Sequence, residues 1–552
     1  MKKGFATIFG ISMLAMAVLL CALPLAAQNN GTPKVSMQHA VAFAVSPPVR
    51  DLPDLQPTIT YGFHETEPPR RVNFHPGRGQ LNNPDPALQT ATGNPDVSVT
   101  LGMSVEGINN LCGCYPPDTN AAVGDTQIVE WVNLHYAVYD KATGALLKGP
   151  LAGNTLFTAL GGPCASNNEG DPIALFDKVH HVWFLSQFKV QNPAYFCVAV
   201  STSNDATGTY YLYAFTTVDF NDYPKWGMWP TGYFGTDNHF NNSGSAYLNA
   251  RLHALNDVKM RAGDPSAEHI EVQLSANDYS ILPADVDSPT PPPAGQPEFF
   301  IGSYDVTASN NQLFLYSMAP DFTTGQAVVT GSNLANPITV PTYTPFCDSS
   351  RSCVPQLGTT TRVDALGDRL MYRFVYWEDP PIVSVKANPP IPLPQQHWWV
   401  NHTNTANGVA GVRWYEFAAP IKKVDTTALY LRQSGTFAPA DSQYRWMASQ
   451  AQDKMGNLAL AYSISSSTMY PSINLVYRGV LDPLGQVGNE TVLTAGTGSE
   501  SATGSRWGDY SSISLDPSDH CTMWATQEYF TTPAGGAAWH TKLNQFKFSN
   551  CN

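Results

Sequence analysis

Apolar residues recur along the C-terminal two thirds of the chain in short runs that are separated by polar, acidic turns. The clearest copy spans 444–462 around the acidic turn 453–457, and a second spans 505–529 around the turn 516–519. Each copy reads as strand, turn, strand, because apolar and aromatic runs flank a cluster of turn-forming residues. The pattern therefore predicts a small β-sheet that is repeated along the chain.

Seven such hairpin starts can be placed in the sequence. They are Asp118, Asp171, Asp222, Glu298, Arg362, Arg445 and Arg506. They divide 118–551 into units of about 62 residues, enough for four strands and their turns. A small sheet must stack on its neighbours to bury its apolar face, so we predict an all-β, seven-bladed β-propeller. Misreading one start would give six or eight blades.

The N-terminal part of the chain has a different character. A basic start, an apolar stretch and a small-residue cleavage site predict a signal peptide at 1–27, with an uncleaved membrane anchor as the alternative. The bulky Leu20 before Cys21 argues against a lipoprotein signal. Residues 28–110 contain 11 prolines and predict an extended leader. We therefore expect a secreted or periplasmic protein whose propeller domain spans 111–552.

The cysteines fit an oxidising compartment. Removal of Cys21 with the signal leaves eight, an even number. Local pairing would join Cys112 to Cys114, Cys164 to Cys197, Cys347 to Cys353 and Cys521 to Cys551, although spacing alone does not prove this connectivity. Zinc binding by these thiols is disfavoured because paired CxxC spacing is missing.

Composition narrows the choice of partner. The chain has 552 residues, a formal net charge of -14, 44 prolines and 62 aromatic residues (25 Phe, 25 Tyr and 12 Trp). A protein with this charge lacks the basic stripe that nucleic acid binding requires. We expect an extracellular glycan or protein as partner, no nucleic acid, no membrane after signal cleavage, and a monomer.

Propellers bind ligands where the innermost strands enter the central channel. The residues that lead the predicted hairpins are therefore the candidate ligand-binding residues. They are Asp118, Asn120, Asp171, Asp222, Arg362, Arg369, Arg445, Arg506, Asp509 and Tyr510. In this set we expect Asp509 to pair with Arg506 or Arg445. The Arg-Trp pairs also have a structural interpretation, with the guanidinium stacked on indole between blades.

The candidate ligand-binding residues suggest two classes of function. The first is a binding platform for a glycan or a protein. The alternative is a sialidase-like glycoside hydrolase, which needs an arginine cluster, a Tyr nucleophile with a Glu base, and an Asp acid. Arg362, Arg445 and Arg506 are the candidate cluster, and Tyr510 or Tyr372 the candidate phenol. Because Glu378 and Glu528 are both predicted at outer strand ends, no glutamate is well placed, and binding is favoured.

Calcium is the only cofactor that the sequence suggests. The segments 167–171 and 285–287 gather carboxylate and amide oxygens on tight loops, which suits a hard cation. Asx turns explain the same segments without a metal. The histidines lack the HExxH spacing of zinc proteases.

The segment 203–211 is similar to a stretched Asp-box, the turn found in sialidase-type propellers. A wider set of motifs resembles a family of secreted bacterial β-propeller proteins with sialidase-like repeats. These motifs are 116–120, 131–133, 161–164, 171–172, 222–225, 367–373 and 506–510. The resemblance implies the fold and secretion. It implies no activity for any individual residue.

Overall fold

The computed structural model describes residues 1, 33–53, 84–90, 93–190, 193–303, 311–331, 337–347, 351–379, 395–502, 504 and 506–552. The predicted signal peptide, apart from Met1, lies outside these ranges.

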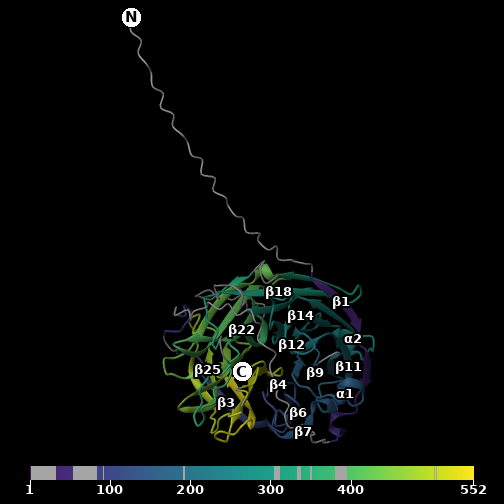
Figure 1. Cartoon of the computed structure of the whole chain (residues 1–552), viewed down its shortest axis with the longest axis horizontal. Coiled ribbons are helices and arrows are strands. Elements are labelled where there is room, and N and C mark those ends of the chain that lie inside the picture. The colour runs from purple at the N-terminus through teal and green to yellow at the C-terminus, as the bar shows by residue number, and fades with distance from the viewer. Residues whose placement is uncertain are drawn as a thin grey trace.

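The described residues form an almost entirely β structure in which the sheets are arranged around a centre (Figure 1). Two sheets have five strands, one has nine and three have four, and nearly all neighbouring strands are antiparallel. The first three sheets in chain order contain the following strands, apart from two that the N-terminal segment adds. They are β4 (Thr119–Val123), β5 (Gln127–Val132), β6 (His135–Asp140) and β7 (Leu146–Ala152); β8 (Ile173–Asp177), β9 (Val182–Lys189), β10 (Ala194–Ser201) and β11 (Tyr210–Thr217); and β12 (Phe220–Trp229), β13 (Gly232–Phe240), β14 (Tyr247–Leu255) and β15 (Glu268–Gln273).

The nine-stranded sheet is two four-stranded units and one short strand, joined by the parallel pairing of β16 with β21. Its strands are β16 (Leu282–Val286), β17 (Glu298–Ser303), β18 (Gln312–Asp321), β19 (Gln326–Gly331), β20 (Ile338–Thr339), β21 (Leu370–Glu378), β22 (Gln395–Ala406), β23 (Val409–Pro420) and β24 (Tyr430–Phe437). The last two sheets hold β25 (Tyr444–Gln452), β26 (Leu458–Ser466), β27 (Met469–Arg478) and β28 (Gly488–Thr494), followed by β29 (Ser512–Leu515), β30 (Thr522–Phe530) and β31 (Trp539–Phe548).

Helices are few and short in the described residues. They are α1 (Gly162–Ser166), α2 (Asp257–Arg261) and the 3-10 turns η1 (Val49–Asp51), η2 (Gly153–Phe157) and η3 (Thr426–Ala428).

The first strands of the successive units contact one another in a cyclic order. β4 contacts β8, β8 contacts β12, β12 contacts β16, β16 contacts β21, β21 contacts β25, β25 contacts β29, and β29 contacts β4. β4, β8, β16 and β29 are short and buried throughout, and β12, β21 and β25 are longer but buried apart from the first residue of β12 and of β25. These strands therefore form the inner layer around which the other strands lie. The order in space follows the order in sequence, as expected for repeated units of this kind.

The described parts of the predicted leader supply strands to three sheets. β1 (Lys34–His39) pairs with β15, β2 (Ala42–Val45) pairs with β11, and β3 (Val99–Asn109) pairs with β31. Each is added at the outer edge of a sheet formed by later residues. The last sheet therefore contains three C-terminal strands and one strand that precedes the predicted domain start at residue 111.

The core lies between the sheets, where large aromatic side chains fill the space. Ten tryptophans are among the largest fully buried side chains, namely Trp131, Trp183, Trp226, Trp377, Trp398, Trp414, Trp446, Trp507, Trp524 and Trp539. Several pack edge to face, as Trp446 does on Trp507, which joins the last two sheets.

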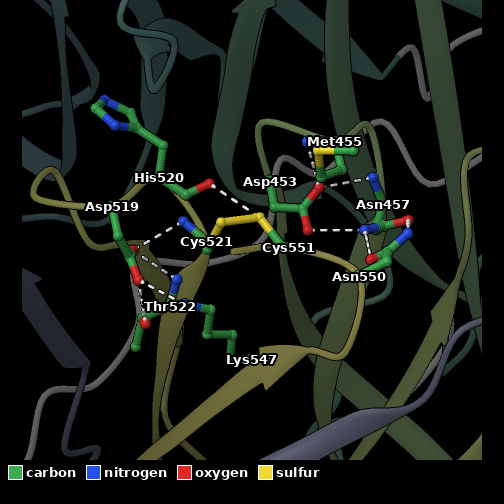
Figure 2. Close-up of a disulfide and its surroundings, with 10 residues drawn as sticks. All are labelled: Asp453, Met455, Asn457, Asp519, His520, Cys521, Thr522, Lys547, Asn550 and Cys551. Atoms are coloured by element: carbon green, nitrogen blue, oxygen red, sulfur yellow. Dashed lines mark hydrogen bonds and ion pairs between the residues drawn. A yellow bond between two sulfur atoms is a disulfide. The ribbon is translucent and has the colours of Figure 1, made fainter.

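All four predicted cysteine pairs are confirmed as disulfides: Cys112–Cys114, Cys164–Cys197, Cys347–Cys353 and Cys521–Cys551. Figure 2 shows the disulfide Cys521–Cys551, which ties the residue before β30 to the third residue after β31. The carboxylate of Asp519 accepts hydrogen bonds from the backbone N–H of Cys521 at 2.9 Å and of Thr522 at 2.8 Å. Asn457 in the preceding sheet donates to Asn550 at 2.8 Å, so the C-terminus is fixed to two sheets.

Three local predictions need correction. The start placed at Glu298 is the second strand of its unit, because β16 precedes it. The pattern of 251–261 also predicts one short helix, but this segment is mostly β14, and only α2 at its end is helical. In the Asp-box-like turn 203–211 we expect Asp205 to cap backbone N–H groups and Gly208 to have a positive φ. Asp205 does accept from the Thr207 backbone N–H at 2.9 Å, but Gly208 is not in the left-handed region.

Candidate functional site

Seven of the predicted site residues come together where the inner strands begin, and the lysine of β12 lies among them. We call these residues the inner-strand cluster: Asp118, Asp171, Asp222, Lys225, Arg369, Arg506, Asp509 and Tyr510. Asp118 and Asp171 immediately precede β4 and β8, Asp222 and Lys225 lie in β12, and the others precede β21 and β29. All eight side chains are buried.

Local backbone geometry directs these side chains inward. Asp118, Asp171 and Tyr223 have positive φ angles, of 53°, 41° and 55°. In β12 the register shifts between Asp222 and Lys225, which is a β-bulge. Bulges and left-handed residues re-aim side chains next to the strand that they interrupt. The motif 222–225 therefore directs polar side chains toward the inner-strand cluster.

Hydrogen bonds connect the cluster across sheets. The guanidinium of Arg506 donates to Asp509 at 2.5 Å, which confirms one of the two expected pairings. The backbone N–H of Asp509 donates to the Asp118 carboxylate at 3.0 Å, and that of Tyr223 donates to Asp171 at 3.1 Å. The cluster thus joins the first, second, third and last units through charged groups.

Lys225 is the central cation of the cluster. Its ammonium nitrogen lies 3.5 Å from the ring centroid of Tyr223 and 3.9 Å from that of Tyr510, and it donates to the backbone oxygen of Pro224 at 3.0 Å. Burial lowers the pKa of Lys225 to about 8, while the charges of the surrounding aspartates oppose this shift. An ammonium between two rings with carboxylates nearby is a strongly held cation.

The carboxyl groups of the cluster have raised pKa values. Burial, followed by the charge of Asp509, raises the pKa of Asp118 to about 7 and that of Asp222 to about 6. Burial also raises the pKa of Asp171 well above its usual range, reinforced by Asp118 and Asp222. Several carboxyls that share one buried space cannot all ionise easily, so protons or a ligand must share the site.

Arginines line one side of the cluster. Arg369 donates to the hydroxyl of Tyr279 at 3.0 Å and to the carboxylate of Asp368 at 3.1 Å. Arg351 pairs with Asp364 at 3.0 Å, and its pKa is lowered by burial, with Arg506 and Arg369 adding to the shift. Arg351 thus lies within electrostatic range of Arg369 and Arg506, and this set differs from the predicted arginine trio.

Three of the predicted site residues do not belong to the inner-strand cluster, namely Arg362, Arg445 and Asn120. Arg362 is exposed and donates to the backbone oxygen of Cys353, and Arg445 is buried between Asp441 and Glu490. Arg362, Arg445 and Arg506 therefore do not share a partner. Asn120 accepts from the backbone N–H of Ala174 at 2.7 Å, so it links β4 to β8.

The expected phenols and glutamates also need correction. Tyr510 donates to the backbone oxygen of Pro172 and Tyr372 to that of Trp226, both at 3.2 Å, so neither forms a Tyr–Glu pair. Glu528 is not at an outer strand end. It lies buried in the middle of the last sheet, accepts from the Gly508 backbone N–H at 3.1 Å, and has a pKa raised well above its usual range by burial.

Neither predicted calcium segment gathers its oxygens around one point. Asp285 and Asp287 bind the guanidinium of Arg373, and Asp287 also binds Lys178, so cationic side chains stand where calcium would. In 167–171 the polar side chains bind separate backbone groups, as Asn168 binds the oxygen of Leu134 and Glu169 the N–H of Val190.

A different group could hold a metal ion. Asp237, His239 and His253 are buried in the third sheet and bring one possible ligand atom each within 4.8 Å of the others. This group could not be predicted from the sequence, because its members lie on two strands with no motif spacing.

Sequence reasoning also missed Lys225 of the inner-strand cluster and four residues that interact with the cluster, namely Tyr223, Glu500, Glu528 and Arg351. Lys225 and Tyr223 belong to the motif 222–225, which was singled out as a motif but not as a site. The hydroxyl of Tyr223 and Oε1 of Glu500 are buried without a hydrogen-bond partner within the described part of the chain.

Comparison with known proteins leaves the family open. No family model matches the chain, and no curated protein matches it. Solved structures that are similar include a protein of unknown function from Dyadobacter fermentans DSM 18053 (9% identity, 81% of this chain and 99% of that chain, TM-score 0.37). An ulvan lyase, described as a new family of polysaccharide lyase, has 11% identity over 77% of this chain and 97% of its own, with a TM-score of 0.36. The α-L-arabinanase of Penicillium chrysogenum has 8% identity over 81% and 98%, with a TM-score of 0.30. These similarities are too low to assign a fold family or an activity.

One further observation concerns membranes. None of the helices within the described ranges has the length and apolar character needed to cross a bilayer.

Proposed function

We propose that this chain is a secreted, monomeric seven-bladed β-propeller that binds an extracellular glycan at the inner-strand cluster. The cyclic contacts of the seven first strands support the closed ring and the blade count. The four disulfides support an oxidising compartment. In this arrangement the cluster lies at one end of the central channel, the usual ligand site of the architecture.

The observation that carries the proposal is the convergence of buried polar groups from several sheets on one point. Aspartates that lead three different units face the same lysine, and their pKa values are shifted by one another. Such concentrations of perturbed groups are typical of functional sites. The unpartnered hydroxyl of Tyr223 and the carboxyl of Glu500 add groups that a ligand could satisfy. Carboxylates, guanidinium groups and phenol rings together suit a polyhydroxylated ligand.

A glycan-array screen of the chain after signal removal tests this proposal. The hits would then be titrated against Asp222→Asn, which keeps the shape of the side chain and removes its charge. Arg362→Ala, at an exposed position outside the cluster, is the matched control. We expect Asp222→Asn to weaken binding by about tenfold or more, as loss of one charged hydrogen bond does, and Arg362→Ala to leave it unchanged. Wild-type protein that binds no glycan, or equal binding by both variants, would overturn the proposal. Binding of a protein instead would keep the site and replace the ligand.

A glycan-cleaving activity is the second candidate, and one observation favours it. Arg351, Arg369 and Arg506 lie together beside carboxyls with raised pKa values, which is the kind of arrangement that holds an anionic sugar next to a proton donor. Hydrolysis of a fluorogenic sialoside by wild type, and its loss in Arg369→Lys, is the expected result of this reading. No turnover with any array hit leaves binding as the function.

A further inference from the structure

A line of buried polar side chains crosses the third sheet, from β13 to β15. Asp237 and His239 lie on β13, His253 on β14 and His269 on β15. Asp237 and His239 are two residues apart and so share a face of the sheet. His253 lies opposite Gly235 and is therefore the diagonal neighbour of Asp237. The sheet register itself brings one carboxylate and two imidazoles together.

The contacts between these groups are short. Nε2 of His253 lies 2.9 Å from Oδ1 of Asp237, and Nε2 of His239 lies 3.0 Å from both oxygens of the same carboxylate. Each of the three residues is at most 2% exposed. A Zn²⁺ ion binds imidazole nitrogen and carboxylate oxygen at about 2.0–2.2 Å, so ligand atoms spaced in this way need only small shifts to surround one. Asp237 can supply both oxygens, which completes four donor atoms.

Two further observations point to a bound cation. Nδ1 of His239 is buried with no hydrogen-bond partner within the described part of the chain, so the group at Nε2 alone holds this ring. Arg251 lies opposite Asp237 in the register, yet it pairs with Glu271 and Asp219. The carboxylate of Asp237 is thus buried without a guanidinium, and a buried charge needs a compensating one.

We propose that Asp237, His239 and His253 bind one Zn²⁺ ion, and that His269 is a positioning residue behind His253. Nδ1 of His253 lies 2.9 Å from Nε2 of His269, whose other nitrogen lies 3.0 Å from the Gln38 amide. A metal-binding histidine usually donates its second ring N–H to a neighbouring group, which fixes the orientation of the imidazole. In the zinc-bound state His253 keeps its proton on Nδ1 and donates it to Nε2 of His269. The amide of Gln38, whose nitrogen lies beside Nδ1 of His269 in the structure, must then turn so that its oxygen accepts from this ring. The ion would therefore fix β1, which carries Gln38, to the third sheet.

The full-length chain, purified without a histidine tag, tests the site. It is stripped with a chelator, and then Zn²⁺ or Co²⁺ alone is added. We expect one metal per chain by elemental mass spectrometry, a tetrahedral Co²⁺ absorption spectrum, and a rise in melting temperature on Zn²⁺ addition, because a ligand that binds only the folded state stabilises it. Metal-free wild type with no spectrum and no thermal response would overturn the proposal.

Variants assign the metal to these residues. His253→Asn is expected to abolish the Co²⁺ spectrum. The matched control is His402→Asn, since His402 is also buried but is bound to Tyr415 at 3.0 Å in another sheet. His269→Gln should weaken Zn²⁺ affinity by about 10-fold while one metal still binds, as loss of an outer partner does. Should His253→Asn fail to fold, this affinity shift and the wild-type spectrum still decide the matter. Full metal binding by a folded His253→Asn would refute the assignment.

Discussion

Individual charged residues connect the first sheet to the last through buried hydrogen bonds. Asp509 binds Arg506 through its carboxylate and Asp118 through its backbone, and all three are nearly inaccessible to solvent. A buried ion pair is not by itself strongly stabilising, but removal of one partner leaves an uncompensated charge. The free energy of unfolding of a variant that lacks one partner therefore tests how much the folded protein depends on this pair.

Asp509→Asn is expected to lower the free energy of unfolding by about 3–5 kcal/mol, because it removes one partner of a buried ion pair. Asp441→Asn is the matched comparison, since Arg445 keeps Glu490 when it loses the half-exposed Asp441. Its cost should stay below about 1 kcal/mol. Chemical denaturation of both variants measures the difference, and equal losses would contradict this account of the cluster.

Glu130 gives a residue-scale prediction of pH dependence. Its carboxylate accepts from the Ile108 backbone N–H at 2.9 Å, from the Tyr139 hydroxyl at 3.0 Å and from Thr541 at 2.6 Å, yet burial still raises its pKa to about 7. The folded state thus binds a proton more tightly than the unfolded chain does. Its stabilising contribution is fully present below about pH 4.5 and is lost as the pH rises through about 7.

The expected loss from this group is about 3 kcal/mol between these limits, since each pKa unit corresponds to about 1.4 kcal/mol. Glu130→Gln cannot ionise, so the stability of the variant relative to wild type should rise as the pH increases from about 5 to about 8. Unfolding free energies of both proteins across this range supply the measurement. A difference that does not change with pH would show that Glu130 titrates normally.

At the scale of the elements, the disulfides differ in what they constrain. Cys521–Cys551 closes a segment of sequence separation 30 that contains β30 and β31, two of the four strands of the last sheet, whereas Cys112–Cys114 spans a separation of 2. A cross-link stabilises mainly by restricting the unfolded chain, and more so for longer loops.

Replacing Cys521 and Cys551 together by serine is therefore expected to cost about 3–4 kcal/mol. The same double substitution at Cys112 and Cys114 should cost clearly less, because little chain entropy is gained when so short a loop opens. Guanidinium denaturation of the two variants provides the comparison. A larger loss from the 112–114 pair would show that local geometry, and not loop closure, dominates.

At the scale of the whole molecule, the edge strand β3 determines how much of the N-terminal part the folded protein needs. It pairs with β31 and covers an edge that would otherwise be open to other chains. A chain that starts at residue 84 keeps β3 and should remain folded with a lowered melting temperature, since it lacks β1 and β2. A chain that starts at residue 111 should aggregate. Circular dichroism and light scattering distinguish the two, and a soluble, cooperatively folding 111–552 fragment would contradict the prediction.

The sequence was informative where local chemistry determines local structure. Apolar runs separated by polar turns placed each predicted start except Glu298 within or shortly before the first strand of a unit, and cysteine spacing predicted the four disulfides of the described residues. The unit at Glu298 was misplaced because its true first strand, β16, contains Pro283 and Asp285, which read as turn residues. β1 and β2 were missed because edge strands are short and only partly buried.

The candidate site was harder to predict because it depends on three-dimensional convergence. Aspartates at strand starts could be named, since position in the repeat places them at one end of the sheets. Lys225 and Glu528 could not, because a bulge redirects Lys225 and because Glu528 lies within β30 and not at the start of a unit. The Asp237–His239–His253 group depends on strand register, which no spacing along one segment reveals.

The pairing of β3 with β31 also determines when the protein can be completed. β3 is synthesised long before its partner β31, because residues 110–538 separate the two strands. β3 must therefore remain without this partner while those residues are made. Contacts between such distant segments form slowly, and unpaired strands are prone to association. Biogenesis of this protein thus includes a late step in which β31 pairs with β3.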